Sequence, residues 1–193
     1  MARLNVPTQN LTITAAAEIR AYVEPFGMWY ERWEVAGRLP EKATAQDILE
    51  AFKPEIEKLN ARGGFVTADV INVNPETPGL DAMLAKFSTE HTHSEDEVRF
   101  VVSGKGIFHI NPETAPVFSV EMEEGDLINV PVGTRHWFNL CADRTICTIR
   151  LFQDITGWTP HYMEDAVDKD YSPLCFNPGQ VKAEKEIKLV VKP

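Results

Sequence analysis

Two histidines and four carboxylates lie in one short stretch of the chain, residues 90–100, which reads EHTHSEDEVRF. His91 and His93 are two residues apart, so on a β-strand both side chains leave the same face. Glu97 follows His93 by four residues, a gap that suits a short turn bringing the carboxylate back beside the histidines. Further along, GDLINVPVGTRHWFNL places His136 just after a Pro and Gly turn, where a strand is predicted to begin.

Three imidazoles and one carboxylate would form a mixed nitrogen and oxygen ligand set for a divalent metal. Such a set suits Fe²⁺, Ni²⁺, Mn²⁺ or Zn²⁺, and four protein ligands leave two positions open on an octahedral ion. A catalytic metal needs neighbouring open positions to bind a bidentate substrate. A closed tetrahedral zinc site is the structural alternative, although structural zinc sites favour cysteine. The spacing therefore predicts a metal centre built from His91, His93, Glu97 and His136.

Arg99 follows Glu97 by two residues, so on a strand the two side chains face the same side. The opposite face is left to three apolar residues, Val98, Phe100 and Val102. A guanidinium that points into a β-protein needs an anionic partner. Two interpretations stay open: Arg99 meets an anionic substrate at the metal centre, or it forms a structural ion pair with Glu95, Asp96 or another acid.

The elements that must position these residues change character near Gly64. Residues 14–64 are predicted to be helical, with helix formers in TAAAEIRAYVEPF and a second helix that begins at Thr44, an N-cap followed three residues later by Asp47. Pro54 predicts a kink in this helix, and the Gly pair at 63–64 predicts its end. One helical face carries Ile48, Phe52, Ile56 and Leu59.

After Gly64 the pattern favours short strands separated by Gly, Pro, Asn and Asp. The predicted strands are FVTADVINV, EVRFVVSG, KGIFHIN, FSVEM, GDLINVP, RHWFNL and TICTIRLF. Many short strands with turn signals between them indicate a sandwich or a barrel. Parallel strands would need longer helical crossovers than these gaps provide, so the sheet is predicted to be antiparallel.

Length and charge narrow the class of protein. The 193 residues suggest a single domain, 1–193, with a helical part at 14–64, a barrel core at 65–158 and a C-terminal extension at 159–193. The charge of −10, from 19 basic and 29 acidic residues, argues against nucleic acid and anionic membranes as partners. The extension has no predicted role; its apolar KLVV segment could pair with a sheet edge or stay loose.

Cysteine use and the absence of apolar stretches suggest a compartment. The three cysteines have no C-x-x-C spacing, so the sequence indicates free thiols rather than a disulfide framework or a thiolate zinc site. The first residues contain no apolar stretch that could serve as a signal peptide, and no run of 18 apolar residues occurs. We therefore expect a cytoplasmic protein.

Two motifs of this sequence resemble those of the cupin superfamily. The patterns H-x-H-x3-E-x6-G, from His91, and G-x5-P-x-G-x2-H, ending at His136, match the ligand-bearing parts. Ala85 stands where a Gly is usual, and Asn139 comes one position early. More specifically, EHTHSEDEVRF, GDLINVP, HWF, TICTIRLF and the GW pair at 157–158 resemble the acireductone dioxygenase family, together with WYERWEV and FVTADVINV. The resemblance covers roughly residues 26–162.

The resemblance implies a fold, a reaction and a set of ligands. The fold would be a mainly β, cupin-type antiparallel barrel (a double-stranded β-helix or jelly roll) with N-terminal helices packed outside. The reaction would be oxidation of an acireductone by O₂ in methionine salvage, with one Fe²⁺ or Ni²⁺ per chain. Iron would give 4-methylthio-2-oxobutanoate and formate, and nickel 3-methylthiopropanoate, CO and formate. The same four residues would be the ligands, and the protein would be a monomer.

The resemblance also implies roles for residues that are not ligands. Arg99 would be catalytic, because it would promote the dianionic form of the substrate. Glu90 and Asp96 match positions credited with metal incorporation and with passing on conformational changes. Phe138 and Trp158 could line an apolar pocket for the methylthio group, although core packing explains each of them too.

Three alternatives remain open. One is another metal-dependent cupin enzyme, such as a sugar isomerase or a different dioxygenase. The others are a non-catalytic cupin binding module and a cupin that no longer binds metal. Arg99 and the HWF run at 136–138 are the features that favour the acireductone reaction over these.

Overall fold

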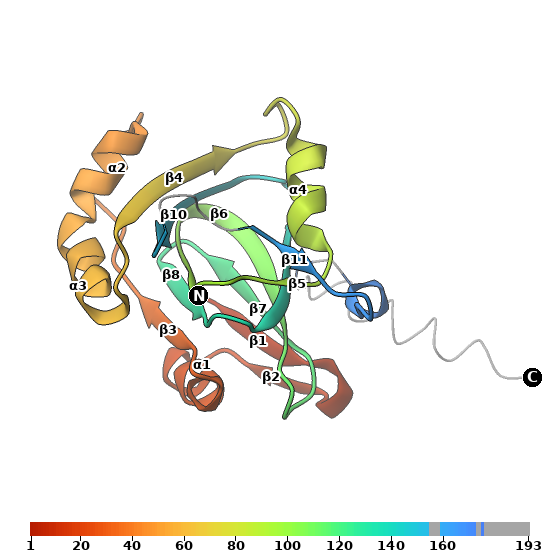
Figure 1. Cartoon of the computed structure of the whole chain (residues 1–193). Helices are drawn as coiled ribbons and strands as arrows, with labels where there is room; N and C mark the ends of the chain where they lie inside the picture. Colours follow the sequence, from red (N-terminus) through yellow and green to blue (C-terminus); the bar gives the residue numbers. More distant parts are fainter. Residues whose placement is uncertain (155–158, 173–174, 176–193) are drawn as a thin grey trace, which may run out of the picture.

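The computed structural model describes residues 1–154, 159–172 and 175 and shows a mainly β protein whose strands curve around a common interior (Figure 1). The strands are β1 (Arg3–Val6), β2 (Leu11–Ile13), β3 (Trp29–Arg32), β4 (Thr67–Val73), β5 (His91–Thr92), β6 (Glu97–Asn111), β7 (Phe118–Glu123), β8 (Asp126–Val130), β9 (Arg135–Leu140), β10 (Ile146–Phe152) and β11 (His161–Tyr162). The helices are α1 (Ala16–Val23), α2 (Ala45–Ala51), α3 (Lys53–Gly63) and α4 (Leu80–Ser88), with 3-10 turns η1 (Pro7–Gln9), η2 (Glu24–Phe26) and η3 (Asp168–Asp170). Among the described residues, no helix is long and apolar enough to cross a membrane.

Every strand pair is antiparallel, as predicted, and β6 joins the two halves of the sheet. The beginning of β6 pairs with β8 and β10, and its end pairs with β7 and β9. The sequence predicted two strands here, divided at Gly104. The chain bends at this residue without ending the strand: Gly104 has φ +81°, and a Cβ there would collide with the backbone of Thr145 and Ile146.

The predicted second helix is present as two helices. Thr44 caps α2 through a capping box with Asp47, as its spacing indicated. α2 ends at Ala51, and Phe52 is the cap residue between it and α3, which has Pro54 in its first turn, so the expected kink is a break between two helices. Gly64 ends α3 in the left-handed conformation.

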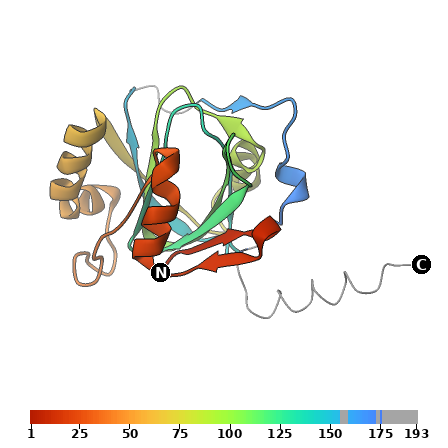
Figure 2. The same cartoon turned by 90° about the horizontal axis from the view of Figure 1, so that it is seen from below.

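The two faces of the first half of β6 are divided as its alternation predicted. Val98, Phe100 and Val102 face outward and share a hydrophobic cluster with the apolar face of α2 and α3. In Figure 1 these two helices lie together outside β4. A second cluster fills the interior and includes Val101, Phe108, Ile110 and Phe138. α1 adds Ile19 and Val23 to this interior cluster and lies in front of the strands when the molecule is seen from below (Figure 2).

Several short helices and strands were not predicted from the sequence. The N-terminal strands β1 and β2 extend the sheet beyond β7, and β3 lies inside the stretch that was predicted to be helical. Strands of three or four residues are too short for a period of two to stand out. α4 was also missed; it carries helix formers, LDAMLAKFS, but it is short and lies between predicted strands. The apolar KLVV segment lies outside the described residues.

The prediction of free thiols was wrong for two of the three cysteines. Cys141 and Cys175 form a disulfide, with Cα atoms 5.3 Å apart. They are separated by 34 residues, and only the tertiary fold brings them together. Cys147 is free and buried, and burial raises the pKa of its thiol to about 11.

His109 lies on the outer face of the second half of β6 and is buried. Its ring stacks on Trp137, with ring centroids 4.8 Å apart and an interplanar angle of 2°. Tyr171 closes over both rings. Burial lowers the pKa of His109 to about 4, against the opposing effect of a hydrogen bond with the backbone of Ser172.

This burial predicts a loss of stability in mild acid. Between pH 6.5, the ordinary pKa, and about 4, the unfolded chain binds a proton that folded His109 excludes, so stability falls as pH falls through this window. His109→Phe keeps the stack and should remove up to about 3 kcal/mol of that loss. Urea unfolding at a series of pH values measures it. The exposed His161→Phe is the control, and equal slopes for wild type and His109→Phe would contradict the prediction.

Candidate metal centre

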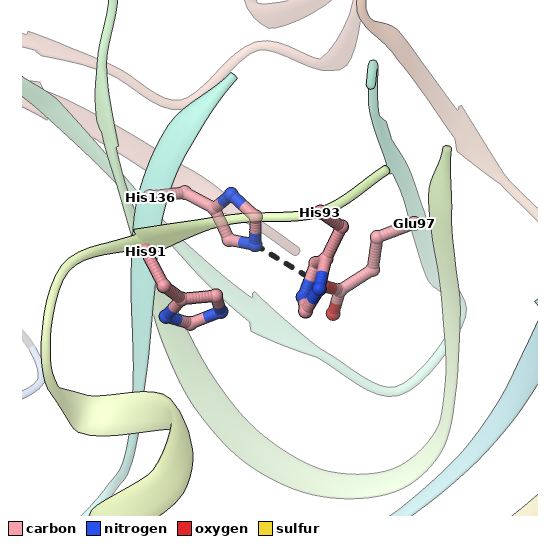
Figure 3. Close-up of side chains that lie close together, drawn as sticks. All are labelled: His91, His93, Glu97 and His136. Atoms are coloured by element: carbon pink, nitrogen blue, oxygen red, sulfur yellow. Dashed lines mark hydrogen bonds and ion pairs between the residues drawn. The ribbon is translucent and has the colours of Figure 1, made fainter. Parts of the chain in front are cut away.

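Two neighbouring strands and the start of a third carry the predicted ligands. His91 lies on β5 directly opposite His136 on β9, and His136 in turn lies opposite Ile110 of β6. His93 follows β5, and Glu97 is the first residue of β6. Figure 3 shows the four side chains converging from these segments.

The structure brings all four predicted ligands together. Their candidate ligand atoms lie within 4.8 Å of one another, and none of the four residues is more than 3% exposed. Oε2 of Glu97 lies 3.1 Å from Nε2 of both His93 and His136. The turn predicted between His93 and Glu97 therefore does return the carboxylate to the histidines.

Backbone carbonyls orient all three imidazoles. In each ring Nδ1 lies at hydrogen-bond distance from a carbonyl oxygen, which can only accept, so Nδ1 carries the proton and donates. The carbonyls are those of Thr89 for His91 (2.7 Å), Thr159 for His93 (3.1 Å) and Thr134 for His136 (2.7 Å). This tautomer leaves the Nε2 lone pair as the metal-binding atom, the usual arrangement of histidine ligands in metal sites.

The protonation states of the cluster also fit a divalent metal. Nε2 of His91 is buried with no hydrogen-bond partner among the described residues. Burial, together with the neighbouring His136, lowers the pKa of His91 to about 4, so its imidazole is neutral at pH 7. Burial opposes ionisation of Glu97, but the positive charge of Arg99 beside it holds the pKa of its carboxyl well below the ordinary range. Neutral imidazoles and a carboxylate are the forms that bind metal.

Arg99 forms its ion pair with Glu97. Nε of Arg99 donates to Oε1 of Glu97 at 2.6 Å, and both side chains are buried. The shared face predicted from their spacing is therefore the interior. One carboxylate oxygen of Glu97 faces the guanidinium while the other faces the histidines.

Aromatic rings surround the Arg99 guanidinium. The ring centroids of Phe138, Phe87 and Phe108 lie 5.4, 5.7 and 5.9 Å from its central carbon. Phe138 can lie over β6 because Gly106 has no side chain there; a Cβ would collide with the ring. Phe138 was expected at the site, but Phe87 and Phe108 were not. A register shift at Val102, where Cys147 pairs with Ser103 but Thr148 pairs with Val101, changes which residues of β6 face inward, and α4 was not predicted. Trp158 lies outside the described residues.

Glu90 and Arg135 clamp the ligand-bearing strands from the outer side. Arg135 donates to Glu90 from Nε and Nη2, at 2.8 and 3.1 Å. Asn111 and the backbone N–H of Val167 donate to the same carboxylate at 2.7 Å. Burial raises the pKa of the Glu90 carboxyl, but these donors lower it further, so the carboxyl is ionised.

Asp96 connects the first ligand segment to the turn before the last ligand. Its Oδ1 accepts a hydrogen bond from the backbone N–H of Val132 at 2.9 Å. The next residue of that turn, Gly133, donates its N–H to the carbonyl of His93 at 3.0 Å. Glu95 turns the other way and accepts from the backbone of Gln153 and Asp154.

A second group of potential ligand atoms consists of Glu121, Cys141 and Cys175. The two sulfur atoms are bonded to each other, so neither is a thiolate ligand in this state. Of these two groups among the described residues, only the four-residue cluster has ligand atoms that are available to bind a metal.

An antiparallel, mainly β fold with three histidines and one glutamate in its interior defines a metalloprotein of the cupin class. Residues 11–160 match the ARD/ARD' family, and the chain belongs to that family. It is 42% identical over 163 residues to an acireductone dioxygenase of Picosynechococcus sp., covering 84% of this chain and 93% of the relative. It is 38% identical over 169 residues to that of Bacillus subtilis, covering 83% and 94%.

A solved structure gives the same fold. It is described as acireductone dioxygenase from Bacillus anthracis with a cadmium ion in its active centre, and it is 39% identical to this chain. The two superpose with a TM-score of 0.79 over 84% of this chain and 98% of the other. The cupin-type fold expected from the two motifs is thereby confirmed.

The convergence of four ligands predicts that each is needed to hold a metal. After incubation with Ni²⁺ and removal of unbound ion, the wild-type protein should retain one ion per chain, measured by elemental analysis. His136→Ala should lose more affinity than the about 10–100-fold that removal of an outer-shell partner costs. Arg62→Ala, which removes an exposed side chain of α3 outside the cluster, is the control. A His136→Ala protein that retains a full complement of nickel would remove His136 from the ligands.

Proposed function

We propose that the protein is an acireductone dioxygenase that oxidises 1,2-dihydroxy-3-keto-5-methylthiopentene with O₂ in methionine salvage. One Fe²⁺ or Ni²⁺ per chain would be held by His91, His93, Glu97 and His136. The observation that carries the proposal is this cluster beside a buried arginine, in a chain of the ARD/ARD' family. We place the protein in the cytoplasm as a monomer, with no nucleic-acid or membrane partner.

Arg99 supplies the positive charge that an ene-diol substrate requires. Loss of protons from the ene-diol gives an electron-rich dianion, and a buried guanidinium stabilises such an anion more strongly than an exposed one does. Arg99 already holds one oxygen of Glu97 at 2.6 Å, so it is fixed beside the ligands. The bound metal would supply Lewis acidity and a template for the two substrate oxygens.

The aromatic rings around Arg99 suit the other end of the substrate. Phe138, Phe108 and Phe87 present apolar surface next to the charged centre. Thioether sulfur makes favourable contacts with aromatic rings, so a methylthio group is a fitting occupant. We propose that Phe138 binds this group and that Trp158, which lies outside the described residues, does so too.

Glu90 and Asp96 support the ligands from outside the cluster. We propose that Glu90, buried beside His91 and bonded to Arg135 next to His136, holds the two ligand strands in register for metal incorporation. Asp96 is placed to pass movement between the segment of His93 and the turn before His136, because it binds that turn through Val132.

The identity of the products tests the proposed function. Protein loaded with iron should consume O₂ with acireductone and form 4-methylthio-2-oxobutanoate and formate. Protein loaded with nickel should form 3-methylthiopropanoate, CO and formate. Oxygen consumption and chromatography of the products measure both. No oxygen uptake with either metal would contradict the proposal and leave a binding module or a different cupin enzyme.

Replacement of Arg99 separates its catalytic role from a structural one. Arg99→Leu should keep the metal and slow turnover by about 10²–10³-fold, because one stabilising group for the dianion is lost. Arg99→Lys, which retains the charge, should recover part of the rate. Arg62→Leu, which removes an exposed ion pair with Glu31, is the control. Loss of metal from Arg99→Leu would favour a purely structural ion pair with Glu97.

A further inference from the structure

Residues 159–172 form one segment that begins at the metal centre and runs along the outside of the strands (Figure 2). We call this segment the C-terminal strap. At its first residue, the carbonyl of Thr159 accepts the hydrogen bond from Nδ1 of His93. Its strand β11 then pairs with β5, placing Tyr162 opposite His91. The strap therefore contacts two of the four ligands, and it supplies the outer partner of one of them.

The middle of the strap is bonded to Glu90, the residue before His91. The backbone N–H of Met163 donates to the Glu90 carbonyl at 3.1 Å, and that of Val167 donates to the Glu90 carboxylate at 2.7 Å. The backbone N–H of Glu90 donates to Asp168 at 3.2 Å. These bonds tie the strap to the strand that carries the first ligand.

The far end of the strap is attached at β9, the strand that carries His136. Tyr171 lies over Trp137 of β9, with ring centroids 5.7 Å apart. Beyond it, Cys175 is bonded to Cys141, the first residue after β9. The disulfide thus fastens the end of the strap to the element that carries His136.

Polar contacts hold the strap at the surface: besides these bonds, Asp165 pairs with Arg135 at 3.1 Å, and the Tyr162 hydroxyl donates to the carbonyl of Lys86 at 3.1 Å. None of its residues, 159–172, is buried, whereas the strands beneath it are largely buried. A segment with few buried apolar contacts opens locally at low cost in free energy. A covalent link at its end raises the effective concentration of the strap at its docking surface.

We propose that Cys141 and Cys175 form a reversible thiol–disulfide site that sets how tightly the protein retains its metal. In the oxidised state the disulfide keeps the strap docked and Thr159 against His93. In the reduced state the strap opens more often, His93 loses its outer partner and the metal leaves faster. This inference rests on the metal-binding role of the four-residue cluster, not on the acireductone reaction.

The reductant would be a dithiol. One of its thiolates attacks the sulfur of Cys175, which is less buried than Cys141, and displaces the Cys141 thiolate. The second dithiol sulfur then displaces Cys175 and closes a disulfide within the reductant. Two electrons and two protons pass to the protein, which gains two thiols. In the cytoplasm, where we place the protein, disulfides are usually transient and redox-sensing.

The release of Ni²⁺ to an excess of chelator tests the proposal. Oxidised wild-type protein is compared with protein that has been reduced and freed of reductant before nickel is added. Reduction should speed release about tenfold, the lower end of the effect of losing an outer-shell partner. Cys175→Ser should release nickel at the fast rate whether or not it has been treated with reductant. Amide hydrogen exchange should be faster in strap peptides of both fast-releasing forms.

A matched variant separates this role from a general loss of stability. Cys147→Ala leaves a small cavity in the cluster beneath α2 and α3, away from the strap, and lowers the free energy of unfolding without touching the disulfide. It should release nickel at the oxidised wild-type rate. Release that follows the melting temperature across all variants would overturn the proposal, and so would equal release from oxidised and reduced protein.

A count of reactive thiols tests whether the disulfide forms. Oxidised, denatured protein should show one reactive thiol and reduced protein three; three thiols in protein exposed to a mild oxidant would overturn the disulfide. None of these measurements of metal release, hydrogen exchange and thiol content uses acireductone, so they do not depend on the proposed reaction. Protein that binds nickel but fails to oxidise acireductone would contradict the proposed function while the redox test still gives an answer.

Discussion

The buried carboxylate of Glu97 is the constraint on which the rest of the structure depends. A carboxylate taken out of water is costly unless charges and hydrogen bonds compensate it. Here Arg99 faces one oxygen, and His93 and His136 face the other. The same side chain therefore links the metal ligands to the positive charge proposed for the substrate, so the site and the interior of the protein are stabilised together.

The scaffold brings these groups together through one long strand. β6 pairs with β8 and β10 near Glu97 and with β7 and β9 near its other end, so it connects the segments that carry Glu97 and His136. Backbone carbonyls then fix each imidazole, and Glu90 and Arg135 hold the two histidine-bearing strands from behind. The strap supplies the carbonyl of Thr159, which orients the imidazole of His93. The segment after the barrel is therefore a part of the metal centre.

The net charge of −10 is a poor guide to the ligand. Part of the acidic excess has a local use, because Glu90, Asp96 and Glu97 hold strands, turns and the proposed cation in place. The proposed substrate is itself an anion, so the overall field does not attract it. Arg99 and the metal must provide positive charge locally, against that background.

The faces of β6 could be predicted from the sequence because they follow from spacing within a strand, which is local geometry. The ligand set was indicated by the close spacing of His91, His93 and Glu97 and by the Pro and Gly turn before His136. His91 and His93 share a face, as do Glu97 and Arg99, and the capping box at Thr44 and the outward face of Val98 follow in the same way. Only the tertiary structure decided the approach of Phe87, the carbonyl of Thr159 behind His93 and the pairing of Cys141 with Cys175. These contacts join residues far apart in the chain, and they depend on the register shift in β6 at Val102 and on the path of the strap, which no local pattern encodes.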